Sequence, residues 1–177
     1  KLIKLDGVVS EDELLDDGTV LEGTLKNLQK QAGDLTGFDA LAVEIASPVG
    51  SVSEGLMIMS WFDYLSQKGI KVITIVTANA YSIASLIMLA ANLRLVSIHS
   101  KIMVHNPMIP ELKMANADIL EGHLSDLRGL ENNMHKIYKI FKARNLIKIL
   151  TAGVNMTHLS LRFLPCFKLS LTIPLIL

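Results

Sequence analysis

Ser82 stands where a predicted strand gives way to a predicted helix, a place where a hydroxyl can act as a nucleophile. The chain before it, 72–77, is rich in β-branched residues, and the chain after it, 83–91, is rich in leucine, methionine and alanine. A serine at such a junction can project out of a sheet, while the first helical amides, starting with Ile83, can stabilise a developing anion. The same position also suits a serine that only caps the helix, and the residues alone leave both interpretations open.

His105 ends another predicted strand and precedes Asn106-Pro107, where the proline stops ladder pairing. An imidazole at a strand end can act as a general base at neutral pH, or it can be a structural residue with satisfied hydrogen bonds. No histidine is spaced with Cys, Asp or Glu in the way that metal ligands are, so we predict no metal site. The turn at 49–51 has too few glycines for a phosphate-binding loop.

These side chains need a scaffold, and the hydrophobic pattern predicts strands that alternate with helices. Predicted strands cover 2–9, 40–46, 71–77, 93–98 and 101–105, and predicted helices cover 19–31, 53–67, 82–91 and 115–143. This order indicates an α/β fold of stacked βα units around a mainly parallel sheet, with the candidate loops at its carboxyl edge. The last helix is too long for a globule of this size to cover, so we expect it to project or to pack against another subunit.

Composition narrows the class of protein. The chain has 177 residues, half of them apolar, and 17 basic residues balance 17 acidic ones, which favours one domain with its own core. Zero net charge argues against a nucleic-acid binder, and the single cysteine, Cys166, indicates a reducing compartment because it cannot form an internal disulfide. We expect no secretory signal, and we interpret the uncharged stretch 72–92 as a core strand and helix rather than a membrane span.

Three ordered motifs resemble the proteolytic subunit of the Clp protease family, including its bacteriophage-type members. The turn Ser47-Pro48-Val49-Gly50-Ser51-Val52 is similar to the family's Ser-Pro-Gly-Gly-Ser-Val turn. The segment Asn79-Ala80-Tyr81-Ser82-Ile83-Ala84-Ser85 resembles its nucleophile segment, and Ile102-Met103-Val104-His105-Asn106-Pro107 resembles its histidine segment. The resemblance runs from residue 2 to about residue 141, and it implies a fold related to that of the crotonases.

By this resemblance, Ser82 is the nucleophile, and His105 is the base that takes its proton and returns it to the leaving amine. The backbone amides of Gly50 and Ile83 form the oxyanion hole. The implied activity is that of a serine endopeptidase that hydrolyses unfolded polypeptides without a cofactor or a metal. The resemblance also implies a cytoplasmic protein that forms heptameric rings, single or stacked in pairs, and receives substrate from an ATP-dependent unfoldase, with no nucleic-acid or membrane partner.

The chain departs from the family pattern near the site. Val49 and Ala78 stand where the family has glycine, and a β-branched residue would strain the turn at 49 if that position needs a positive φ. The family also places a triad aspartate beyond the long helix, whereas the last acidic residue of this chain is Glu131. Asn155 falls in about the right region and is the remaining candidate to orient His105.

The C-terminal part of the chain has a different character. Residues 132–177 carry seven basic residues and no acidic one, and no strand and helix pattern is evident after about residue 146. We therefore predict a Clp-like peptidase domain at 1–145, incomplete at its C-terminal end, and an anomalous tail at 146–177 that is frame-shifted or unstructured. Two other functions stay open: an inactive ring or peptide-binding subunit that lacks the triad aspartate, and an acyl-CoA enzyme of the crotonase type.

Overall fold

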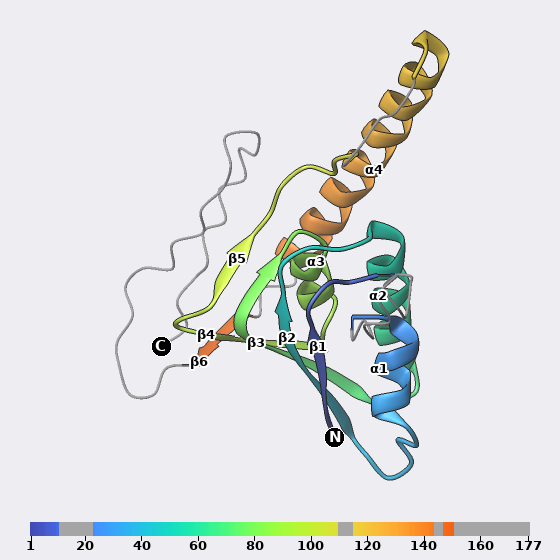
Figure 1. Cartoon of the computed structure of the whole chain (residues 1–177). Coiled ribbons are helices and arrows are strands. Elements are labelled where there is room, and N and C mark those ends of the chain that lie inside the picture. The colour runs from blue at the N-terminus through green and yellow to red at the C-terminus, as the bar shows by residue number, and fades with distance from the viewer. Residues whose placement is uncertain (11–22, 110–114, 144–146, 151–177) are drawn as a thin grey trace.

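The structure, a computed structural model, describes residues 1–10, 23–109, 115–143 and 147–150. The described chain forms a six-stranded sheet in the order β1-β2-β3-β4-β6, with β5 beside β3, and all of its paired strands are parallel. Strands and helices alternate along the chain except at β4 and β5, which follow each other directly (Figure 1), and this order confirms the predicted α/β fold with its mainly parallel sheet. In chain order the elements are β1 (Leu2–Asp6), α1 (Leu25–Ala32), β2 (Ala40–Ser47), α2 (Val52–Gln67), β3 (Lys71–Tyr81), α3 (Ile83–Leu89), β4 (Leu93–Ser97), β5 (Lys101–Met103), α4 (Ala117–Ala143) and β6 (Ile147–Leu150).

One face of the sheet is buried under a layer of helices. Burial alternates along the strands, so that Leu41, Val43 and Ile45 of β2 are fully buried while the residues between them are not. Helix α2 contacts both α1 and α3 above this face (Figure 1), and it contributes Ile58 and Phe62 to the core. Because the sheet packs against these helices, its carboxyl edge and the candidate loops on that edge are fixed in position.

Two strands near the candidate site differ from their predicted lengths. Strand β3 continues to Tyr81 instead of ending at Thr77, because its last residues gain a second partner in β5. Strand β5 ends at Met103 instead of His105, because β3 turns into α3 and leaves the following residues without a strand to pair with. The stretch 72–92 thus forms a strand and a short helix, as predicted, and no helix of the described ranges is long and apolar enough to cross a membrane.

Helix α4 extends away from the body of the protein (Figure 1), which confirms the prediction of a projecting helix. Its first half exposes apolar side chains, among them Ile119, Leu120 and Leu124. Its second half packs against the body of the protein, where Met134 and Tyr138 are buried near α3. The exposed half suits the expected contact with another subunit, which stays a prediction.

The sheet also includes residues beyond the predicted end of the domain. Strand β6 pairs with β4 in parallel, with Arg94 opposite Ile147 and Ser97 opposite Leu150. This strand falls inside the segment 146–177 that we predicted to be an anomalous tail. Residues 151–177 lie outside the described residues, so the division of the chain into domain and tail stays a prediction.

Candidate active site

The three strand ends that carry the candidate loops lie side by side. Ser47 of β2 pairs with Ala80 of β3, and Ala80 pairs with Ile102 of β5, so that these residues form one row across the sheet. Neighbouring strands lie about 4.8 Å apart, which places the three chains within about 10 Å of one another. Because the strands are parallel, the chain leaves each of them at the same edge.

Ser82 and His105 lie on neighbouring chains at this edge. The Ser82 amide donates a hydrogen bond to the Met103 carbonyl oxygen at 2.9 Å, which extends the pairing of β3 with β5 by one step. His105 follows Met103 by two residues, and the serine and the histidine are both half-buried. The two residues predicted to act together are therefore in adjacent segments, each within two residues of one shared hydrogen bond.

Ser82 has an unusual backbone conformation, with φ 55° and ψ −125°. It is the one non-glycine residue of the described chain with a positive φ, a conformation that costs about 1–3 kcal/mol and that clusters at functional sites. Although Ser82 occupies the N-cap position of α3, its side chain makes no capping hydrogen bond. The alternative that this serine only caps the helix is therefore wrong, and its hydroxyl is not committed to the helix end.

The Ser82 carbonyl oxygen is held by the helices that follow. It accepts from the Ser85 amide at 3.0 Å and from the Ser85 hydroxyl at 2.5 Å. Since Ser85 has a single hydroxyl hydrogen, the phenol of Tyr138, 2.7 Å away, donates to the Ser85 oxygen. Burial raises the pKa of Tyr138 to about 12, while its hydrogen bond with Ser85 lowers it by less. Helix α4 thus reaches the backbone of Ser82 through two hydroxyl groups.

Gly50 occupies a point in the turn between β2 and α2 where a side chain does not fit. A Cβ atom at this position would clash with the Cβ of Val9 and would stand 2.5 Å from the Val9 carbonyl oxygen. Val9 is fixed there because its amide donates to Val49 and its carbonyl accepts from Ser51. Val49 does not adopt a positive φ, so the strain that we anticipated at this residue is absent.

The two amides assigned to the oxyanion hole lie in segments that pack together. Within the described ranges, no carbonyl or side chain accepts a hydrogen bond from the amide of Gly50 or of Ile83. Ile83 opens α3, where the first amides of a helix have no partner in the helix itself. Its side chain presses against Gly55 in α2, where a Cβ atom would clash with it. The assignment of these amides to an oxyanion hole stays a prediction.

His105 contacts its own neighbour in the chain. Its Nδ1 lies 2.5 Å from the carbonyl oxygen of Asn106. The side-chain amide of Asn106 donates in turn to Glu131 of α4 at 2.7 Å. Glu131 and Tyr138 are about two turns apart on one face of α4, so this helix contacts both the histidine segment and the serine segment. Asn155, the predicted candidate to orient His105, lies outside the described residues.

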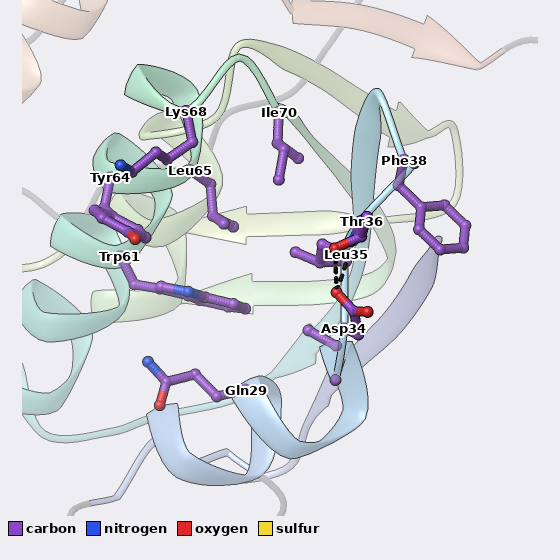
Figure 2. A pocket seen from close by; sticks show the side chains of 13 residues that line it. Gln29, Asp34, Leu35, Thr36, Phe38, Trp61, Tyr64, Leu65, Lys68 and Ile70 are labelled. Carbon is purple, nitrogen blue, oxygen red and sulfur yellow. Dashed lines mark hydrogen bonds between the residues drawn. The ribbon is translucent and has the colours of Figure 1, made fainter.

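A separate hollow lies at the far end of α2 (Figure 2). Its volume is about 530 Å³, and its lining includes Trp61, Tyr64 and Phe38, with a hydrogen bond from the Thr36 hydroxyl to Asp34 at its rim. Trp61 is nine residues beyond Val52, the first residue of α2, or about 14 Å along the helix from the candidate loops. No serine, histidine or cysteine of the described residues lines this hollow. The described residues also contain no cluster of His, Cys, Asp or Glu that could hold a metal ion.

The parallel sheet, its single layer of helices and the projecting α4 define an α/β protein of the Clp protease and crotonase type. A sequence model of the Clp protease family matches residues 34–156, which is more than half of the chain. The chain therefore belongs to the Clp protease family. The matched range includes all three candidate loops, and it continues past residue 141, where we placed the end of the resemblance. No curated protein matches the chain.

Three residues that support the site were not singled out from the sequence. Ser85, Glu131 and Tyr138 make the hydrogen bonds that tie α3 and α4 to the candidate loops. One signal was available: a carboxylate and a phenol stand at positions 131 and 138 on the stripe of α4 that also carries the buried Met134. Polar groups on the inward stripe of an amphipathic helix need partners, and here the partners are the two loops.

Proposed function

We propose that this protein is a serine endopeptidase with Ser82 as nucleophile and His105 as base. The observation that carries the proposal is the hydrogen bond from the Ser82 amide to Met103, which keeps the serine and histidine segments adjacent, together with the lack of a capping hydrogen bond from the Ser82 hydroxyl to α3. Membership of the Clp protease family supports peptide-bond hydrolysis over acyl-CoA chemistry.

The proposed reaction has two steps. His105 Nε2 takes the Ser82 hydroxyl proton as the oxygen attacks the peptide carbonyl carbon, and the oxyanion that forms is stabilised by the amides of Gly50 and Ile83. The C–N bond then breaks as His105 gives the proton to the leaving amine, and an acyl group stays on Ser82. Water, deprotonated by His105, then attacks this ester, the bond between the acyl carbon and the Ser82 oxygen breaks as His105 returns the proton to that oxygen, and the acid is released.

The proposed substrate is an unfolded polypeptide that lies extended across the carboxyl edge. The chain on either side of the site offers backbone groups for this, in the turn at 50–52 and in the segment after His105, whose described residues, up to 109, belong to no strand. The family supports assembly into homo-oligomeric rings, feeding by an ATP-dependent unfoldase, and a cytoplasmic location. Turnover of cellular proteins and maturation of phage capsids both fit such an enzyme.

A second candidate is a catalytically inactive subunit, which is favoured by the lack of any acidic residue after Glu131. Labelling with a fluorophosphonate probe separates the two. We expect the assembled wild-type protein to be acylated at Ser82, the variant Ser82→Ala to be unlabelled, and the variant His105→Ala to be labelled far more slowly. The matched control is Ser60→Ala, which removes an exposed hydroxyl of α2. Folded wild-type protein that takes up no label would establish the inactive alternative.

A further inference from the structure

We infer that the Asn106 carbonyl oxygen and the Glu131 carboxylate hold His105 in the tautomer that a general base needs. The family resemblance gives this role to an aspartate beyond the long helix, which the chain lacks. The inference rests on the proposed function, because it concerns the histidine of the same site. It makes Asn106 and Glu131 positioning residues, since both act through His105.

The first step concerns the proton on the imidazole. The 2.5 Å contact joins His105 Nδ1 to a carbonyl oxygen, and a carbonyl oxygen can only accept a hydrogen bond. The contact is therefore a hydrogen bond only when Nδ1 carries the proton. In a neutral imidazole the other nitrogen, Nε2, then has the free lone pair. A base that takes a proton from a serine needs this arrangement, and a protein that stabilises the opposite tautomer loses most of its rate.

The second step concerns what keeps the Asn106 peptide in place. The side-chain amide of Asn106 donates to Glu131 Oε1 at 2.7 Å. This amide orientation fits the charge on Glu131, because the opposite orientation would set two oxygen atoms against each other. The remaining oxygen, Oδ1, is buried and has no hydrogen-bond partner among the described residues. Glu131 is therefore the group by which α4 fixes the residue that carries the acceptor for His105.

The two residues do only part of what an aspartate does. A carbonyl oxygen selects the tautomer and the direction of the ring, but it is a dipole and carries no full charge to stabilise the imidazolium. The carboxylate of Glu131 lies one residue further away, beyond the side chain of Asn106. We therefore expect a base that is correctly oriented and weaker than one paired directly with an aspartate.

The experiment is a ¹⁵N spectrum of the imidazole nitrogens in the full-length protein labelled with ¹⁵N-histidine. The chain has five histidines, and His105→Gln assigns the signals of His105 by difference. We expect a protonated Nδ1 and an unprotonated Nε2 at His105 at a pH where the ring is neutral. The exposed His99 is the internal reference for an unconstrained ring.

Four variants then locate the positioning groups. Glu131→Ala is expected to lower the ratio of the Nδ1–H to the Nε2–H form at His105 by up to about fivefold, the equivalent of one hydrogen bond. Glu131→Gln keeps an acceptor for Asn106 and should restore the ratio, while Glu121→Ala, at an exposed position of α4, should leave it unchanged. Asn155→Ala should also leave the ratio unchanged.

Each contrary outcome overturns the inference. A predominant Nε2–H form in the wild-type protein would remove the role of the Asn106 carbonyl. Equal spectra for Glu131→Ala and Glu121→Ala would remove the role of Glu131, and a shift in Asn155→Ala would transfer the role to Asn155. Failure of the inference can be told apart from failure of the proposed function: the expected spectrum without probe labelling of Ser82 would contradict the peptidase alone, and labelling with the opposite tautomer would contradict the inference alone.

Discussion

The amide of Ser82 donates to the carbonyl of Met103 across 2.9 Å, and this contact joins the start of α3 to the end of β5. It lies one step past the last paired residues of the two strands, Tyr81 and Met103. Ser82 has a positive φ; its amide donates to β5, and its side chain makes no capping hydrogen bond to α3. The strained residue, Ser82, is thus itself the candidate nucleophile, and its amide is bonded to the segment that carries His105.

The strain at Ser82 should be measurable as a gain in stability when it is removed. Glycine accepts a positive φ without a steric penalty, so Ser82→Gly is expected to raise the free energy of unfolding by about 1–2 kcal/mol. Ser82→Ala keeps the Cβ atom and should show no such gain. Urea unfolding of the two variants makes the comparison, and equal stabilities would show that the backbone of Ser82 is unstrained.

Glycine at position 50 should be required for both folding and acylation. In Gly50→Ala the new Cβ meets Val9, and we expect a loss of about 1–3 kcal/mol and slower labelling of Ser82, since the turn must move. Gly122→Ala in α4 is the control, because nothing lies within 4 Å of an added Cβ there and alanine favours a helix by about 1 kcal/mol. A Gly50→Ala protein with wild-type stability would contradict the close contact with Val9.

The phenol of Tyr138 should contribute to stability at neutral pH. Tyr138→Phe removes the hydrogen bond to Ser85 in a buried place, and we expect a cost of about 1 kcal/mol, or about 2–4 °C in Tm for a chain of this size. Tyr64→Phe, at an exposed site of α2, is the control and should change Tm little. Calorimetry of both variants tests this, and equal melting temperatures would remove the hydrogen bond from the account.

Tyr138 should also make stability fall in strongly alkaline solution. The unfolded chain releases the phenolic proton near pH 10, whereas the folded chain keeps it up to a pKa of about 12. Between these values deprotonation favours the unfolded chain, so the contribution is complete below pH 10 and declines up to pH 12, by about 3 kcal/mol in total. Urea unfolding from pH 9 to 12 should show this decline in the wild-type protein relative to Tyr138→Phe. Parallel curves for the two proteins would contradict it.

Local pattern was enough to predict every described element except β6, and the edge of the sheet on which the site stands. The β-branched run at 72–77 and the apolar helix after it are strong signals, and a parallel sheet gathers its loops at one edge whatever the strand order. Strand β3 pairs with β4 at residues 73–76 and with β5 at residues 79–81, and this change of partner could not be predicted from local pattern. It depends on a pairing between residues 79–81 and 101–103, which no local pattern encodes.

The hydrogen bonds that Glu131 and Tyr138 make to the site could not be predicted from the sequence for a related reason. Glu131 reads in the sequence as an ordinary charged residue of a long helix, and Tyr138 reads as one of its apolar residues. Their roles depend on how α4 crosses the sheet edge, since only the packed fold brings them to Asn106 and Ser85. Side-chain contacts between distant elements are set by this packing and not by helical period alone.

Strand β3 pairs first with β4 and then with β5, and this change of partner limits how the connection between β4 and β5 can vary in length. Strands β4 and β5 are joined by three residues, Ile98 to Ser100, and both must pair in parallel with the same neighbour. A codon gained or lost there would either be taken up as a bulge or displace β5 by one position. The second outcome would turn His105 to the opposite side of the chain, so relatives that conserve the histidine should also conserve the length of this short connection.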